Sequence, residues 1–203
     1  ALVDVARSDG ETSALVLTTA CDQMRYAAAL VDHEGSLPIF LVNLPSTWRT
    51  TAAQQLYEAE LQRLGRFLVR LGGGAPEKEH LVAVFEEHDR GRSEARAAAR
   101  RTFASSNGAV PLALVGGPLL EEDGVIFDLV EEAGGRVVLD ATEQGERTMP
   151  RPFDSTRLRQ DPLRELADAY FGSIPDVFRR PNTGLYEWLD QEVTARGVCG
   201  ILF

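Results

Sequence analysis

Short apolar runs alternate with longer amphipathic segments along the first half of the chain. The runs have the length of buried strands, whereas apolar positions that recur every three or four residues indicate helices. Thr19 or Asp22 is expected to cap the first helix, because both side chains carry an acceptor oxygen. The predicted strands are 14–17 and 38–43, and the predicted helices are 23–30, 51–71 and 78–103.

The same alternation continues after Ser105–Gly108, a turn-forming stretch. The predicted strands there are 111–115, 137–140 and 198–203, and the predicted helices are 123–133, 161–170 and 185–195. The polar, arginine-rich stretch 143–161 is expected to be an irregular surface loop. Strands that alternate with helices are typical of parallel sheets covered by helices, so the sequence predicts an α/β protein.

We expect two α/β lobes joined by a helical connection. Residues 1–108 would form the first lobe with the connecting helices, and residues 109–203 would form the second. The chain starts without Met and ends in the apolar run 200–203. A buried strand rarely carries a terminal carboxylate, which is costly to bury. We therefore expect a piece of a longer subunit, with the second lobe incomplete at its C-terminus.

The charge balance limits the classes of binding partner that we expect for this chain. The chain has 21 basic and 31 acidic side chains, a formal net charge of −10. Such a chain repels phosphate backbones, so neither nucleic acid nor an anionic membrane is expected as its main partner. No apolar run approaches the roughly 20 residues that span a bilayer. Two cysteines cannot form a disulfide framework, and we expect a cytoplasmic protein.

Candidate chemistry lies where strands end, because open parallel sheets bind ligands at the carboxyl ends of their strands. This rule selects 18–22, 43–47, 116–118 and 140–145. Cys21 lies beside a predicted helix N-terminus, which favours the thiolate form that ligates metals. An isolated cysteine is more often a small buried apolar residue, and both interpretations stay open. Gly116 and Gly117 suit either close backbone approach to a ligand or a tight turn.

Other reactive side chains give weaker signals. Cys199 lies within a predicted strand and is expected in the core. His33, His80 and His88 have no partner at metal-ligand spacing and are expected to be solvated or at the core edge. The chain has no phosphate-binding glycine motif and no nucleophile elbow. From the residues alone, the chain is a small-ligand α/β protein with one thiol of interest.

The order of several segments resembles one family. The segment 15–25 contains Cys21-Asp22-Gln23-Met24-Arg25 and resembles the strand–turn–helix motif CD-x-M-R of the 2-hydroxyacyl-CoA dehydratase and benzoyl-CoA reductase family. Five further segments are similar in the same order: 39–45, 56–64, 110–119, 134–138 and 196–201. The chain is most similar in type to the D-component of 2-hydroxyglutaryl-CoA dehydratase.

This resemblance implies a fold, a reaction and a set of partners. Family subunits have two flavodoxin-like lobes that hold a [4Fe–4S] cluster, usually through three cysteines, and related subunits pair as heterodimers. An ATP-dependent iron–sulfur activator protein supplies one electron to a coenzyme A thioester. A ketyl radical forms, and water leaves the 2-hydroxyacyl-CoA. The chain is thus expected to be a lyase subunit or a related low-potential reductase.

By motif position, Cys21 corresponds to the middle cluster ligand, and the other ligands would lie outside the sequence. Asp22 and Arg25 would orient its turn. Geometry alone adds candidate substrate-binding residues at the strand ends: Thr18, Thr19, Pro45, Gly116 and Gly117. Two alternatives share the fold, namely a cluster-free, non-catalytic partner subunit and a reductase of the benzoyl-CoA or double-cubane type.

Overall fold

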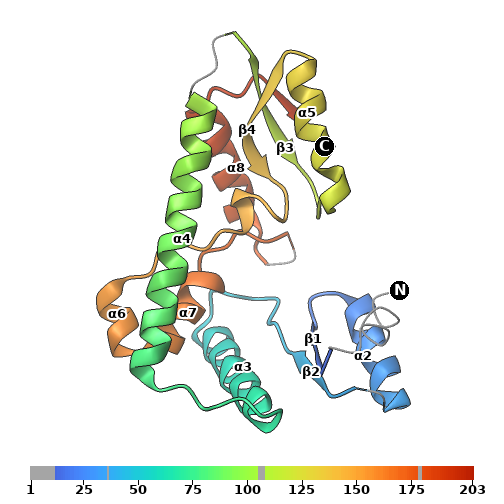
Figure 1. Cartoon of the computed structure of the whole chain (residues 1–203), viewed down its shortest axis with the longest axis vertical. Helices are drawn as coiled ribbons and strands as arrows, with labels where there is room; N and C mark the ends of the chain where they lie inside the picture. Colours follow the sequence, from blue (N-terminus) through green and yellow to red (C-terminus); the bar gives the residue numbers. More distant parts are fainter. Residues whose placement is uncertain (1–11, 36, 105–107, 178–179) are drawn as a thin grey trace. The chain divides into compact units, whose positions relative to one another are not determined.

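The computed structural model describes residues 12–35, 37–104, 108–177 and 180–203. The chain divides into two compact units, Ala1–Lys78 (the first unit) and Glu79–Phe203 (the second unit). Each unit contains a parallel sheet with helices packed against it, which confirms the predicted α/β class (Figure 1). The lobe boundary near residue 108 and the flavodoxin-like topology remain predictions.

The first unit is built on one β–α–β connection. The strands β1 (Leu15–Thr18) and β2 (Ile39–Val42) are parallel, and α2 (Asp22–Glu34) joins them and packs against both. A long helix, α3 (Thr51–Arg70), packs against β2. The core of the first unit consists of Phe40, Val42 and Phe67, with Ala14, Leu44 and Leu64 around them. The predicted strands and helices of this unit are confirmed to within a few residues at their ends.

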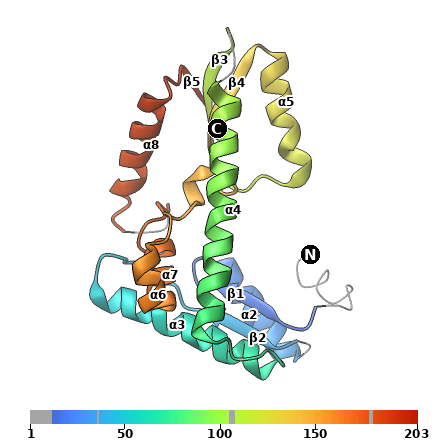
Figure 2. The ribbon, with the colours of Figure 1, turned by 60° about the vertical axis from the view of Figure 1, so that its left-hand side comes forward.

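The second unit contains a three-stranded parallel sheet in the order β4 (Gly135–Ala141), β3 (Val110–Val115), β5 (Gly200–Leu202). The helices α5 (Val125–Glu132) and α8 (Thr183–Ala195) cover its opposite faces (Figure 2). Because successive side chains of a strand point to opposite faces, Ala113 packs in the α8 cluster and Leu114 in the α5 cluster.

The stretch 143–161 is not the irregular surface loop that its polarity predicts. It contains a 3-10 turn, η2 (Glu146–Thr148), and the helix α6 (Ser155–Gln160), and α7 (Pro162–Tyr170) follows it. Glu146 is buried because the Arg196 guanidinium donates to both of its carboxylate oxygens, at 2.6 and 2.7 Å. Paired charges can be buried where single ones cannot, and a polarity pattern does not show the pairing.

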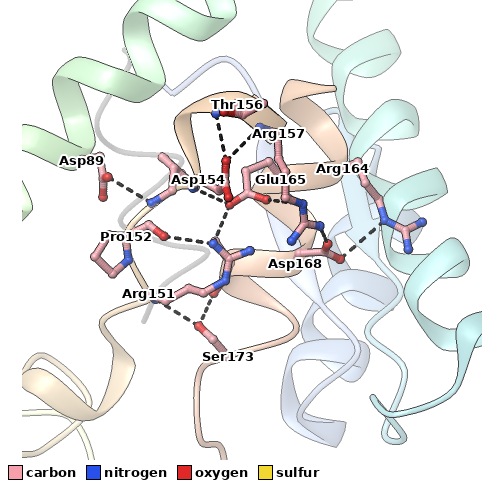
Figure 3. Close-up of polar contacts among 12 residues, drawn as sticks. Asp89, Arg151, Pro152, Asp154, Thr156, Arg157, Arg164, Glu165, Asp168 and Ser173 are labelled. Carbon is pink, nitrogen blue, oxygen red and sulfur yellow. Dashed lines mark hydrogen bonds and ion pairs between the residues drawn. The ribbon is translucent and has the colours of Figure 1, made fainter. Parts of the chain in front are cut away.

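A second paired carboxylate, Glu165 of α7, holds α6 and α7 together. It is fully buried and accepts hydrogen bonds from Arg151 (2.5 Å) and from the Asp154 N–H (2.9 Å), with the Arg157 Nε 3.3 Å away (Figure 3). Burial would raise the pKa of Glu165. The hydrogen bonds from Arg151 and Asp154 and the two guanidinium charges outweigh burial, so the pKa lies below its ordinary value.

The α6–α7 segment packs against α4 (Lys78–Ala104) through Asp89 and Arg92. Asp89 accepts a hydrogen bond from the Phe153 N–H at 3.0 Å. Arg92 donates to the Tyr170 hydroxyl at 2.8 Å, and its guanidinium lies 5.1 Å from the Phe153 ring centre and 5.3 Å from that of Tyr170. These contacts hold the segment around Phe153, and Tyr170 of α7, against α4.

Two smaller predictions were wrong. Cys199 is exposed and precedes β5, because that strand begins at Gly200. The N-cap of α2 is Cys21, and no side chain caps this helix, so neither Thr19 nor Asp22 has that role. The predicted helix 123–133 is confirmed as α5, which begins two residues later, after the 3-10 turn η1 (Glu121–Gly124). Within the described residues, no helix has the length and apolar character needed to cross a bilayer.

The core of the second unit gives a stability prediction. Leu139 is fully buried in β4, in the cluster against which Trp188 packs. Leu139→Ala is expected to lower the free energy of unfolding by about 2–5 kcal/mol, because the lost contacts leave a cavity. Urea unfolding followed by Trp fluorescence and circular dichroism measures this loss. Leu129→Ala on α5, where Leu129 is 56% exposed, is the control and should change stability by less than about 1 kcal/mol.

The pairing of Glu165 gives a pH prediction. Its folded-state pKa is lowered, so its contribution to stability is fully present above the ordinary glutamate pKa of about 4.3 and is lost as pH falls through the folded-state value. Glu165→Gln should therefore lower the free energy of unfolding by about 1–3 kcal/mol at neutral pH, the range for hydrogen bonds to charged groups. The difference between wild type and variant should shrink as the pH falls below about 4.

Urea unfolding at a series of pH values between about 3 and 7 tests this dependence. Glu87→Gln, at an exposed position of α4, is the matched control and should follow the wild type at every pH. A Glu165→Gln deficit that stayed constant down to the lowest pH would contradict the assigned ionised pair.

Candidate functional site

The candidate thiol lies at the carboxyl end of β1. Thr18 ends the strand, and Cys21 is the N-cap residue of α2, with an extended backbone (φ −126°, ψ 135°). The Cys21 side chain is half-buried, so it is neither a core residue nor fully solvated. The N–H groups of the first turn of a helix have no intrahelical partners, and they favour negative charge at this position. The placement leaves the thiol accessible to a ligand or metal at the strand end.

Thr19 joins the ends of the two strands of the first unit. Its N–H donates to the Val42 carbonyl (2.9 Å), and its hydroxyl accepts from the Leu44 N–H (2.9 Å) and lies 3.3 Å from the Asn43 Oδ1. Its own carbonyl accepts from the Arg25 Nε at 3.1 Å. The structure thus brings together the Cys21 turn and the segment that leads to Pro45. Thr19 is a positioning residue, because its hydroxyl is already in use.

Arg25 and Asp22 lie where the sequence placed them, on the first turns of α2. The Arg25 guanidinium is 3.4 Å from the Asp22 carboxylate, and both side chains are largely exposed. An exposed pair of this kind contributes little stability. The bond from Arg25 to the Thr19 carbonyl is therefore the contact by which this arginine orients the turn.

Glu60 of α3 accepts a hydrogen bond from the backbone just after β2, next to the contacts that hold the Cys21 turn. Only 3% of it is exposed, and its carboxylate accepts from the Asn43 N–H at 3.0 Å and from the Arg63 guanidinium. Sequence reasoning missed this role. The signal was its position seven residues after Ala53 and seven before Phe67, on the apolar face of the helix. A charged residue on such a face needs a partner, and here the partner is the strand-end backbone.

The second unit presents its own strand ends. Gly116 and Gly117 are exposed, and a Cβ on either would meet no atom within 4 Å. The Gly117 carbonyl accepts from the Glu143 N–H at 3.3 Å, so the ends of β3 and β4 lie together. Gly145 is the glycine that the fold requires, because a Cβ there would lie 2.3 Å from the Asp140 carbonyl oxygen. Both Gly116 and Gly117 therefore leave open space beside a strand end.

The described residues do not supply a complete set of cluster ligands. Among them, no group of three or more His, Cys, Asp or Glu side chains could hold a metal ion. His33, His80 and His88 are exposed, as predicted. A [4Fe–4S] cluster needs several thiolates, so Cys21 and the described residues around it do not complete such a site. The other candidate residues of the first unit, Thr18 and Pro45, are half-buried.

The most strongly paired carboxylate, Glu165, is not a candidate catalytic group. A perturbed pKa often marks a functional site, but structural ion pairs also shift pKa values. Glu165 is enclosed by Arg151, Asp154 and Arg157 and is fully buried, so no substrate reaches it. Its role is to order the α6–α7 segment, and the Cys21 turn remains the better candidate.

Comparison with known proteins supports the same turn. Residues 6–107 match the family model of the 2-hydroxyglutaryl-CoA dehydratase D-component. The matched range is about half of the 203 residues. The match includes the Cys21 turn, Pro45 and α3, and it confirms the suspected resemblance. No curated protein matches the chain. The chain belongs to the 2-hydroxyglutaryl-CoA dehydratase D-component family, and is thus related to a dehydratase component.

Proposed function

We propose that this chain is a subunit, or part of one, of an iron–sulfur enzyme that eliminates water from a 2-hydroxyacyl-CoA thioester. The observation that carries this proposal is the family match over residues 6–107, which contains the Cys21 turn. Under the proposal the chain works in the cytoplasm with a homologous second subunit. An ATP-dependent iron–sulfur activator protein provides the electron that starts the reaction.

Cys21 is the proposed cluster ligand of this chain. Three features support the role: it precedes the first turn of α2, it is half-buried, and its position is held by the Thr19 contacts to the end of β2. Because the described residues contain two free cysteines and no group of three metal-ligating side chains, the remaining ligands of a [4Fe–4S] cluster would come from outside them.

The strand-end residues are the proposed substrate contacts. Thr18 and Pro45 flank the Cys21 turn, and Thr19 holds it in place. Gly116 and Gly117 leave space for a ligand to approach the backbone of the second unit. Backbone N–H groups at such positions bind anionic or carbonyl oxygens, which a thioester and its nucleotide carry.

A cluster-free partner subunit of the same fold is the alternative. The described residues contain no group of three or more metal-ligating side chains, which favours this alternative. Under this alternative the Cys21 turn has a purely structural role, and the metal belongs to another subunit.

The substitution Cys21→Ala distinguishes the cluster-ligand role of Cys21 from the cluster-free alternative. In the full-length protein, purified anaerobically from its native host with whatever subunit accompanies it, Cys21→Ala is expected to lose the visible iron–sulfur absorbance and most of its iron and sulfide. Cys199→Ala is the matched control, because Cys199 is exposed and lies in the other unit, and it should retain both. Thermal unfolding of each variant checks that the fold is intact.

Two outcomes would contradict the ligand role. If Cys21→Ala kept the iron, the sulfide and the spectrum of the wild type, the cluster would be held by other residues. If the wild-type protein contained neither iron nor sulfide, the cluster-free alternative would be supported.

A further inference from the structure

A hollow of about 430 Å³ lies along β2 and the C-terminal half of α3, away from the Cys21 turn. Sites for small molecules usually have volumes of about 300–1,000 Å³. Three arginines of one helix and three successive residues of one strand line it, namely Arg63, Arg66, Arg70, Ile39, Phe40 and Leu41. The hollow therefore combines cationic side chains with one edge of a strand.

The arginines lie on one face of α3, since they are three and four residues apart. The Arg63 guanidinium lies 5.2 Å from the Phe40 ring centre, and the Arg70 guanidinium lies 5.9 Å from that of Phe67. Both rings are buried, with centres 5.3 Å apart. The aromatic pair thus supports two of the cationic groups at the edge of the hollow.

The hollow carries a surplus of positive charge in a chain whose net charge is −10. Arg63 is paired with Glu60. Across residues 12–35, 37–104, 108–177 and 180–203, the structure shows no carboxylate paired with Arg66 or Arg70. Arg70 is in the last turn of α3, where the negative end of the helix dipole stabilises a cation. This stabilisation does not extend back to Arg66.

The edge of β2 adds backbone donors to the same place. The carbonyls of Pro38 and Val42 accept from β1, and in a strand alternate residues direct their N–H and C=O groups to the same edge. Ile39 and Leu41 therefore direct theirs to the other edge, on the side of the hollow that they line. In the part of the chain that the structure describes, no strand pairs with that edge.

We infer that this hollow binds the phosphate groups of a nucleoside polyphosphate. Guanidinium groups bind phosphate oxygens in a planar, two-pronged geometry, and backbone N–H groups add further donors. The volume exceeds that of a single phosphate, so the hollow has room for a chain of phosphates. The nucleotide half of a coenzyme A thioester and a free nucleotide share this chemistry. The coenzyme A form of the inference rests on the proposed function, whereas phosphate binding itself does not.

Isothermal titration calorimetry on the full chain tests the inference, with pyrophosphate, ADP, ATP and coenzyme A as probes. Arg66→Gln and Arg70→Gln are each expected to raise Kd roughly fivefold, which corresponds to about 1 kcal/mol, the upper range for an exposed ion pair. The double variant should lose more than either single variant. Binding should weaken at high salt, because exposed charges are screened.

The matched control is Arg90→Gln, which removes the same charge from an exposed helical position in the second unit and should leave every Kd unchanged. Cys21→Ala should also bind pyrophosphate like the wild type, so failure of the proposed function and failure of this inference give different results. Tighter binding of coenzyme A than of ADP or ATP supports the thioester as the source of the phosphates. Tighter binding of ATP supports a free nucleotide.

Two results would overturn the inference. One is the absence of measurable heat with all four probes at millimolar concentration. The other is a double variant whose affinities equal those of the wild type.

Discussion

The candidate site depends on how two parallel strands end. Thr19 bonds to Val42 through its N–H and to Leu44 through its hydroxyl, and the Asn43 N–H donates to the buried Glu60. Without these contacts, the backbone groups beyond the last strand pair would need water, and the turn that carries Cys21 would have no defined position relative to β2. A half-buried thiol gains a reproducible environment because the polar groups beneath it are already satisfied.

The same principle orders the second unit, where buried carboxylates are paired with arginines. Glu146 bonds to Arg196, and Glu165 bonds to Arg151. These pairs allow a polar stretch to pack against the sheet and against α4, although the chain has more acids than bases. Removing one partner of such a pair leaves a buried charge without compensation, which costs more than the pair itself contributes. In this acidic chain, arginines with no acidic partner therefore stand out, and α3 carries two of them among the described residues.

Periodicity was sufficient to predict most of the fold, because strands and helices bury apolar residues at different intervals. It failed where burial depends on pairing: 143–161 looked solvated, since the partner Arg196 lies about fifty residues away in the sequence. Cys199 was expected in the core because it lies within the predicted strand 198–203, but β5 begins one residue after it. The position of Cys21 followed from the strand-to-helix transition. Glu60 was missed although it lies on the apolar face of α3, because one of its partners is the Asn43 N–H, which only the folded chain brings to it.

Glu60 also links the strand-end turn to the hollow on α3. Its carboxylate accepts from the Asn43 N–H and from Arg63, and Arg63 lines the hollow. An anion that drew Arg63 away would leave Glu60 with a less neutralised charge beneath the turn that carries Cys21. A ligand that binds more tightly when Arg63 is turned toward the hollow lowers the population in which Arg63 is paired with Glu60. Arg63 is therefore a poor residue with which to measure anion binding, because its substitution disturbs both places, whereas neither Arg66 nor Arg70 is paired with Glu60.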